Sequence, residues 1–270
     1  MKTFLPLLLF FCSFTSVAQG WMPVGSRSNS MGNASVALTD VWAFHHNPAG
    51  LSELKNIHGG ISYENRFLLK ELQSQSMVVA IPLKKGVVSV GGQFYGYQLY
   101  RSTRAGIGYS MLLSERLSMG VQLSYQGLRL TEAYGSKNTV TAEVGIMAKL
   151  TDKWSLGFSA FNVGRSKLSS FENDRFTALM RLGTRYKVSE KLLFVAEAEK
   201  DLDYVLRAKA GMEYEAMKQF YVRAGFATNP IEVSFGFGYK WRMIQLDLGS
   251  AYHQQLGWSP HFSLTYSPSN

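Results

Sequence analysis

The sequence predicts an all-β fold, namely a transmembrane antiparallel β-barrel of about 14 strands with a short N-terminal hatch segment. Three observations predict it. From about residue 57 onward, apolar and polar residues alternate, the connections between alternating segments are in turn short and long, and aromatic residues stand at the ends of the apolar faces. Successive side chains of a strand point to opposite faces, so each segment has one apolar face and one polar face.

The amino-acid composition excludes several classes of protein. The chain has 270 residues, of which 46% are hydrophobic, 13% aromatic and 17% charged. The charged share lies below the roughly 25% of a soluble domain, and the aromatic share excludes a disordered chain. A formal net charge of +9 is also found in proteins that bind nucleic acids. Because the basic residues are interleaved with acidic ones and form no stripe, we expect no nucleic-acid binding.

Residues 1–18 have the features of a secretory signal peptide. Lys2 precedes a short apolar run, which ends in the small residues Ser16 and Ala18, and this pattern predicts cleavage before Gln19. The run is shorter than the roughly 20 residues that a transmembrane helix needs. The only cysteine, Cys12, lies in this segment, so we expect the exported protein to contain no thiol.

Residues 19–56 do not alternate, and they form the predicted hatch. Small residues such as Gly32, Ala34 and Ala37 permit close packing, and the Asn47–Gly50 stretch has the composition of a turn. A segment this short cannot bury a core of its own. We therefore expect it to pack inside or beneath a barrel formed by residues 57–270.

Fourteen segments of the remaining chain alternate with period two. In one of them Leu117, Val121 and Tyr125 share a face, and Ser118, Gln122 and Ser124 lie on the other. The predicted strands are 57–64, 75–83, 86–97, 101–113, 116–129, 137–150, 153–163, 175–188, 191–200, 204–215, 218–227, 230–241, 243–254 and 259–267.

Connections and aromatic residues support a membrane barrel over a soluble sandwich. Tight links such as 84–86 and 114–115 alternate with longer ones such as 65–74 and 164–174. Short turns on one side and longer loops on the other are typical of outer-membrane barrels. The aromatic residues would form two interfacial belts: Trp154, Tyr186, Tyr214, Phe220, Tyr239 and Trp241 beside the short turns, and Tyr125, Phe176, Phe226 and Tyr252 beside the long loops.

The polar face then becomes the lumen, where neighbouring strands carry opposite charges. Opposite charges on adjacent strands contribute roughly 0.2–1 kcal/mol per pair. We favour a lumen braced by its own ion pairs over an ion-selective pore, because paired charges fill space and cancel the field. The predicted lumen charges are Arg181, Arg185, Glu197, Glu199, Arg207, Lys209, Glu213 and Arg223.

The N-terminal segment resembles the signature of the FadL-like superfamily of outer-membrane barrels, and within it most closely the PorV/PorQ-type proteins of Bacteroidetes that are associated with type IX secretion. The resemblance is carried by Arg27, Gly32, Asp40, Asn47, Pro48, Ala49 and Gly50. It implies a hatch that plugs the lumen from the periplasmic side, and a location in the outer membrane of a Gram-negative cell. The chain departs from the superfamily in its short loops, which leave little room for a surface capture site.

Two function classes follow from the resemblance. The first is a non-enzymatic accessory or adaptor subunit of an outer-membrane machine, with outer-membrane lipid and other outer-membrane or secretion-system proteins as partners. The alternative is passive uptake of a small hydrophobic ligand. Uptake of this kind would use a kink in the third strand, for which Gly91 and Gly92 are the candidates, because paired glycines often mark a bend in a strand. A straight third strand would count heavily against uptake.

Motifs of catalysis and metal binding are not recognisable in the sequence. It contains no Gly-x-Ser-x-Gly elbow and no P-loop, and the adjacent His45 and His46 have poor geometry for one metal ion. We therefore expect no enzyme activity, no cofactor and no metal. The inward glycines Gly106, Gly108, Gly236 and Gly238 could make room either for a ligand or hatch, or for crowded lumen side chains.

Overall fold

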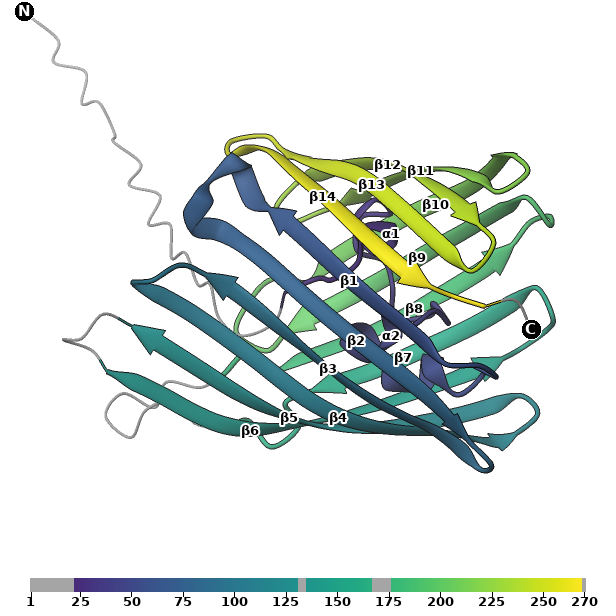
Figure 1. The fold of residues 1–270 in the computed structure, drawn as a ribbon, viewed down its shortest axis with the longest axis horizontal. Helices are drawn as coiled ribbons and strands as arrows, with labels where there is room; N and C mark the ends of the chain where they lie inside the picture. Colours follow the sequence, from purple (N-terminus) through teal and green to yellow (C-terminus); the bar gives the residue numbers. More distant parts are fainter. Residues whose placement is uncertain (1–21, 131–134, 167–175, 269–270) are drawn as a thin grey trace, which may run out of the picture.

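The computed structural model describes residues 22–130, 135–166 and 176–268, and the predicted signal peptide lies outside them. In the described part, 14 antiparallel strands close into one barrel (Figure 1). Each strand pairs with its neighbours in sequence, and β1 closes the ring on β14. The strands are β1 (His58–Asn65), β2 (Gln73–Leu83), β3 (Gly86–Gly96), β4 (Tyr100–Ser114), β5 (Leu117–Leu130), β6 (Ser136–Lys149), β7 (Trp154–Phe161), β8 (Leu179–Lys187), β9 (Leu192–Asp201), β10 (Arg207–Met217), β11 (Phe220–Ala227), β12 (Glu232–Trp241), β13 (Ile244–His253) and β14 (Gly257–Tyr266).

The helical elements of the described residues are all short. They are α1 (Ser26–Asn29), α2 (Ala43–His46), η1 (Pro48–Leu51), η2 (Arg66–Leu68) and η3 (Lys70–Leu72). Within the described ranges, no helix has the length and hydrophobicity that a membrane crossing requires.

Each predicted strand corresponds to one strand of the barrel, and the predicted alternation is confirmed. Along β12, and along β5 up to Gln126, the apolar side chains lie on the outside and the polar ones are buried in the lumen. This outward apolar surface is what a membrane-spanning barrel presents to lipid. At the end of β5 the pattern reverses, with Leu128 buried and Arg129 exposed.

The predicted boundaries differ most at β8, which begins at Leu179 in the described residues. The predicted start, residue 175, lies outside them. The backbone of Phe176 just before it bonds to the preceding loop and not to a strand: its nitrogen donates to the Ser166 carbonyl at 3.1 Å, and its carbonyl accepts from Asn162 Nδ2 at 2.8 Å. Phe176 is only 4% exposed. Its assignment to an interfacial belt was therefore wrong. The other predicted belt residues beside the long loops, Tyr125, Phe226 and Tyr252, are exposed on the outside.

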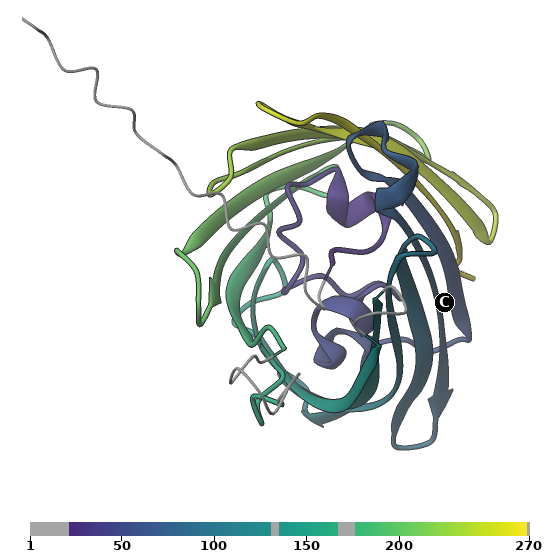
Figure 2. The ribbon, with the colours of Figure 1, turned by 90° about the vertical axis from the view of Figure 1, so that its left-hand side faces the viewer.

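The two ends of the barrel differ in the length of the connections between strands. The links that precede β3, β5 and β13 are two-residue turns at one end, whereas η2 and η3 lie in a long connection at the other. The second end, called the long-loop end below, faces the viewer in Figure 2.

Residues 22–56 run through the lumen and form the hatch. Figure 2 shows this segment enclosed by the ring of strands. Its core residues Met31, Val41, Ala49 and Leu51 are fully buried. A segment without a core of its own is thus buried by the barrel that surrounds it.

Candidate functional site

The hatch touches the wall through a belt of inward glycines, which we call the glycine belt. At each of them a β-carbon would come closer than 3.0 Å to a hatch atom. For example, a β-carbon at Gly120 would lie 2.5 Å from the backbone nitrogen of Ala49, and one at Gly211 would lie 2.5 Å from Cβ of Met31. The belt consists of Gly60, Gly91, Gly120, Gly145, Gly157, Gly183, Gly211, Gly225, Gly236 and Gly249.

Strand register aligns this belt around the barrel. Gly120 lies opposite Gly145, Gly157 opposite Gly183, and Gly211 opposite Gly225. Paired glycines on neighbouring strands create a continuous shelf, on which the backbone of the hatch can lie directly.

The inward glycines Gly106, Gly108, Gly236 and Gly238 divide between the two expected roles. Gly236 lies against Ser30 of the hatch. A β-carbon at Gly238 would instead meet the guanidinium of Arg223 at 2.7 Å, and those at Gly106 and Gly108 would meet wall serines. Both interpretations therefore hold, each for different glycines.

Arg27 ties the hatch to the wall. Its Nη2 donates to Glu213 Oε1 at 2.6 Å, its Nε donates to Glu213 Oε2 at 2.8 Å, and its Nη1 donates to Asp40 Oδ2 at 2.9 Å. Glu213 also accepts from Arg223 Nε at 2.6 Å, and Arg223 continues to Asp247 at 2.7 Å. The predicted lumen charges Glu213 and Arg223 thus belong to a chain of ion pairs that reaches into the hatch.

A second group of wall charges holds the hatch through its backbone. Glu197 Oε2 accepts from the backbone nitrogens of Ser35 and Val36 at 2.7 and 2.8 Å. Lys209 Nζ donates to Glu197 at 3.0 Å and to Glu199 at 2.6 Å. These three side chains therefore form two buried ion pairs between β9 and β10.

The remaining predicted charges have separate surroundings. Arg185 donates to the hydroxyl of Thr39 in the hatch at 2.8 Å, rather than to a carboxylate. Arg207 lies 3.6 Å from Glu232. Arg181 donates to Glu143 at 3.1 Å.

Glu143 is a site residue that was not predicted. It accepts from Arg181 of β8 and also from Arg104 of β4 at 2.9 Å, so one carboxylate of β6 joins strands that are not neighbours. Glu143 and Arg104 both stand at inward positions of the alternation, which could have identified them as lumen charges. Their pairing could not have been identified, since it depends on how the closed barrel brings distant strands together.

The Asn-Pro-Ala-Gly motif forms the turn at the end of α2. Asn47 Oδ1 accepts from the backbone nitrogen of Ala49 at 3.1 Å, and Asn47 Nδ2 donates to the carbonyl oxygens of Val36 and Ile146 at 2.7 and 3.3 Å. Pro48 starts η1, and Gly50 packs against Leu38 and Ala43 within the hatch. Gly32 has a positive φ of 66° and donates its backbone nitrogen to the Ser234 hydroxyl at 2.9 Å. Every motif residue therefore shapes the hatch or attaches it to the wall.

The two hatch histidines are fully enclosed. His46 Nε2 lies 2.7 Å from the carbonyl oxygen of Val24. Burial, and after it the positive charge of Arg181, lowers the pKa of His46 to about 3. Burial also lowers the pKa of His45 well below its usual value. In the described residues, histidine, cysteine, aspartate and glutamate form no group that could hold a metal ion.

A cavity of about 590 Å³, which we call the chamber, opens above the hatch at the long-loop end. Its lower wall includes Asn29, Asn33 and His261, and its upper wall includes Phe67, Tyr95 and Leu179. No pattern in the sequence indicated the chamber. The loops are short, as expected, but strand ends and the hatch together enclose the space.

The third strand is paired without interruption on both sides, and its register shows no break at the candidate kink, Gly91 and Gly92. Glycine in a strand can mark a bend, or a place where another part of the chain comes close to the backbone. Here the ring of Phe44 comes close, because a β-carbon at Gly91 would lie only 2.7 Å from it.

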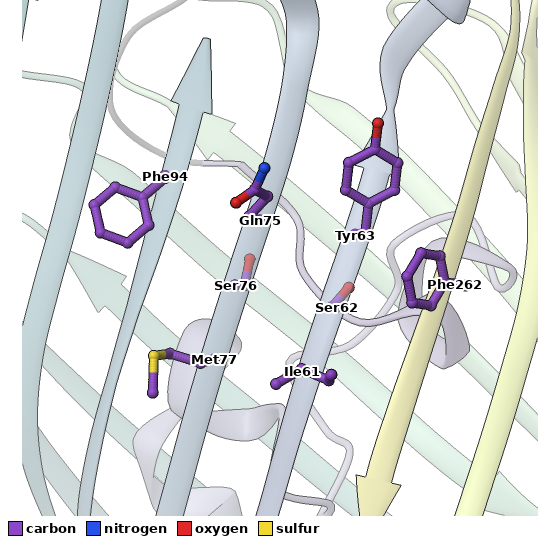
Figure 3. A pocket seen from close by; sticks show the side chains of 8 residues that line it. All are labelled: Ile61, Ser62, Tyr63, Gln75, Ser76, Met77, Phe94 and Phe262. Atoms are coloured by element: carbon purple, nitrogen blue, oxygen red, sulfur yellow. The ribbon is translucent and has the colours of Figure 1, made fainter. Parts of the chain in front are cut away.

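A separate recess of about 290 Å³ lies on the outer face of the wall beside this strand (Figure 3). Tyr63, Phe94 and Phe262 surround it, and Gln75 is a polar side chain within it. Because β1 and β2 pair without interruption behind it, the recess is a feature of the lipid-facing surface and not an opening into the lumen.

Comparison with known proteins finds similar solved structures. No protein-family model matches the chain, and no curated protein matches it. The toluene transporter TbuX of Ralstonia pickettii superposes with a TM-score of 0.68 at 12% identity, over 91% of this chain and 98% of its own.

Two further structures give the same result. The toluene transporter TodX of Pseudomonas putida has a TM-score of 0.64 at 14% identity, over 91% of this chain and 99% of its own. A FadL homologue of Pseudomonas aeruginosa has a TM-score of 0.61 at 12% identity, over 93% of this chain and 100% of its own. The chain thus has the fold of these transport proteins.

Proposed function

We propose that this protein is an outer-membrane channel of the FadL-like type that takes up small, largely apolar molecules. The observation that carries the proposal is the likeness in fold to TbuX, TodX and the FadL homologue over nearly the full length of both chains. The chamber supports it, because a cavity that opens at the long-loop end is where a solute from outside would enter first.

The continuous pairing of the third strand counts against uptake through a kink in the wall, the route that its glycines suggested. A kinked wall would let a solute leave sideways, but β3 is continuously paired on both sides. In this proposal the solute therefore passes from the chamber along the hatch, and the hatch must shift to release it.

Uptake by whole cells tests the proposal. Cells with a lipopolysaccharide-containing outer membrane would express the full chain, and entry of radiolabelled toluene would be measured against cells carrying the empty vector. Faster entry with the protein supports the channel. Equal entry, at confirmed surface levels of folded protein, contradicts it for this solute class.

The accessory or adaptor function remains a second candidate, and the attachment of the hatch favours it. The glycine belt, the Arg27–Glu213 ion pair and the hydrogen bonds from the hatch backbone to Glu197 hold the hatch against the wall, as expected for a barrel that acts through its surfaces. Purification of the tagged protein from its native membrane under mild detergent distinguishes the two. A stoichiometric outer-membrane partner supports the adaptor, and recovery of the barrel alone removes that candidate.

A further inference from the structure

We infer that the end of the barrel with the short turns binds the headgroups of anionic phospholipids in the surrounding membrane. The binding groups are exposed lysine and arginine side chains, at least one in each of the six short turns between consecutive strands. One from each turn, in chain order, they are Lys84, Arg116, Lys153, Lys191, Lys218 and Arg242. The inference goes beyond the proposed uptake function and does not depend on it.

The exposed charge at this end is mainly positive. Lys85 and Lys187 are exposed beside the same turns, and we call these two residues and the six above the basic rim. The exposed carboxylates of the short turns are those of Glu115, Asp152 and Glu190. Eight exposed basic side chains thus stand against three exposed acidic ones, and such an excess attracts anions.

The side chains of the basic rim have no acidic partner in the protein. Among the residues that the structure describes, ion pairs join lumen charges such as Lys209 to Glu197 and Arg223 to Asp247, but none includes a side chain of the basic rim. The fold therefore neutralises its inward charges and leaves those of the rim available to a partner from outside the chain.

Aromatic side chains place the basic rim at the level of the lipid headgroups. The predicted belt residues Trp154 and Trp241 are 43% and 59% exposed on the outside of the barrel. They adjoin Lys153 and Arg242 in the sequence, and the Arg242 guanidinium lies 5.6 Å from the centre of the Trp241 ring. Rings of this kind lie at the membrane–water interface. Since one residue spans about 3.3 Å along a strand, the neighbouring charges are within reach of lipid phosphates.

The ring arrangement favours lipid over a protein as the partner. Strands that are consecutive in sequence are neighbours all the way around the closed barrel, so the six turns are distributed around its whole rim, at the right-hand end in Figure 1. Bilayer lipid surrounds a barrel on every side. An acidic protein would contact one sector of the rim and leave the remaining charges unmatched.

Quenching of tryptophan fluorescence by brominated lipids tests the inference. In a full chain that carries Trp21→Phe and Trp258→Phe, the remaining tryptophans are Trp42, which is buried in the hatch, and the lipid-facing reporters Trp154 and Trp241 beside the basic rim. This protein would be reconstituted in phosphatidylcholine bilayers that contain either brominated phosphatidylglycerol or brominated phosphatidylcholine.

We expect the anionic lipid to bind beside the reporters about fivefold more strongly than the zwitterionic one, because each basic residue near the surface strengthens the attraction to anionic lipid by about this factor. The preference should decrease at about 1 M salt, where the screening length is about 3 Å.

Two matched sets of four substitutions near the reporters locate the binding. The Gln219 carbonyl accepts from the Lys240 nitrogen at 2.9 Å, so the turn that holds Lys218 lies beside the end of β12. The neutral set should reduce the preference to about equal binding of the two lipids, and it consists of Lys153→Gln, Lys187→Gln, Lys218→Gln and Arg242→Gln. The control set should keep the preference because it keeps the charges, and it consists of Lys153→Arg, Lys187→Arg, Lys218→Arg and Arg242→Lys. All four positions are exposed, so we expect both sets to fold.

Equal quenching by the two lipids, in the protein that keeps all of its basic residues, would overturn the inference and leave an acidic protein as the partner to test. A preference that survives the neutral set would also overturn it, because the attraction would then come from another part of the barrel. Loss of the preference in the neutral set alone supports the basic rim as the binding surface.

Discussion

Arg27 of the hatch and Glu213 of β10 form a two-point ion pair, in which Nε and Nη2 donate to the two carboxylate oxygens at 2.8 and 2.6 Å. Because Glu213 also accepts from Arg223, its loss takes one carboxylate from each of two guanidinium groups. Arg27 then keeps only Asp40, and Arg223 keeps only Asp247. Removing one partner of a buried pair costs about 3–5 kcal/mol.

We therefore predict that Glu213→Gln destabilises the barrel more than Arg27→Ala, which leaves Glu213 paired with Arg223. Urea titration of the reconstituted protein, followed by the electrophoretic shift between folded and unfolded barrel, measures the difference. Arg27→Lys should fall between Arg27→Ala and the wild type, since an ammonium cannot donate from two positions of a fork. Equal midpoints for Glu213→Gln and Arg27→Ala would contradict the shared role of Glu213.

Alanine in the glycine belt should displace the hatch. At Gly225 a β-carbon would overlap the backbone of Met31 and Gly32, which has no flexible end that could move aside. Overpacking of this kind costs about 1–3 kcal/mol or more. Protease sensitivity of the hatch in the folded barrel should rise in Gly225→Ala.

Gly59→Ala is the matched control for the belt, because its β-carbon would lie in ordinary contact, 3.5 Å from the nearest atom. It should leave hatch protection unchanged. Similar protection in both variants would show that the hatch does not depend on the belt.

The side chain of Asn47 stabilises the hatch turn, so Asn47→Ala should loosen the turn. The variant loses the donor to Val36 and Ile146 and the acceptor for Ala49. Each buried group left without its partner costs about 1–3 kcal/mol. Hydrogen exchange of the Ala49 amide should become faster, while exchange in the strands far from the hatch should not change.

Acid should weaken hatch docking. His46 has a pKa of about 3 in the fold and about 6.5 when exposed, so the released state binds a proton that the docked state excludes. Docking is thus fully stable above about pH 6.5 and loses stability as the pH falls from there toward 3.

Hatch proteolysis at pH 5 and at pH 7.5 checks this pH dependence. His46→Gln, which keeps a donor for the Val24 carbonyl, should reduce the difference. It should not abolish the difference, because burial lowers the pKa of His45 as well. An unchanged pH dependence in the variant would exclude His46 as its source.

Tethering the hatch should stop uptake if the solute passes along it. Ser118 Oγ of β5 donates to the Ala49 carbonyl at 3.2 Å, so the two residues are in contact, and a disulfide between Ala49→Cys and Ser118→Cys would tether the hatch to the wall. The only cysteine of the sequence, Cys12, lies in the predicted signal peptide.

Uptake of labelled toluene should then fall when the disulfide forms and recover on reduction, whereas each single cysteine variant should behave as the wild type. Full uptake by the oxidised pair would show that the hatch does not have to move at this point.

Period-two alternation determined the barrel, the number of its strands, and the face of nearly every strand residue. That information is local: successive side chains of a strand point to opposite sides, whichever strands become neighbours. Alternation alone therefore assigns Lys209, Glu213 and Arg223 to the lumen, and Val121 and Tyr125 to the outside.

Tertiary structure alone decided what the inward residues meet. The approach of Gly91 to Phe44, the joining of Arg104 and Arg181 through Glu143, and the chamber floor around Asn29 and His261 depend on the path of a hatch without periodicity inside a closed ring of strands. Such contacts join residues far apart in the chain, so no local pattern encodes them. For the same reason the pair Gly91 and Gly92 predicted a bend in β3. In the closed barrel, Gly91 instead leaves room for the ring of Phe44 in the hatch.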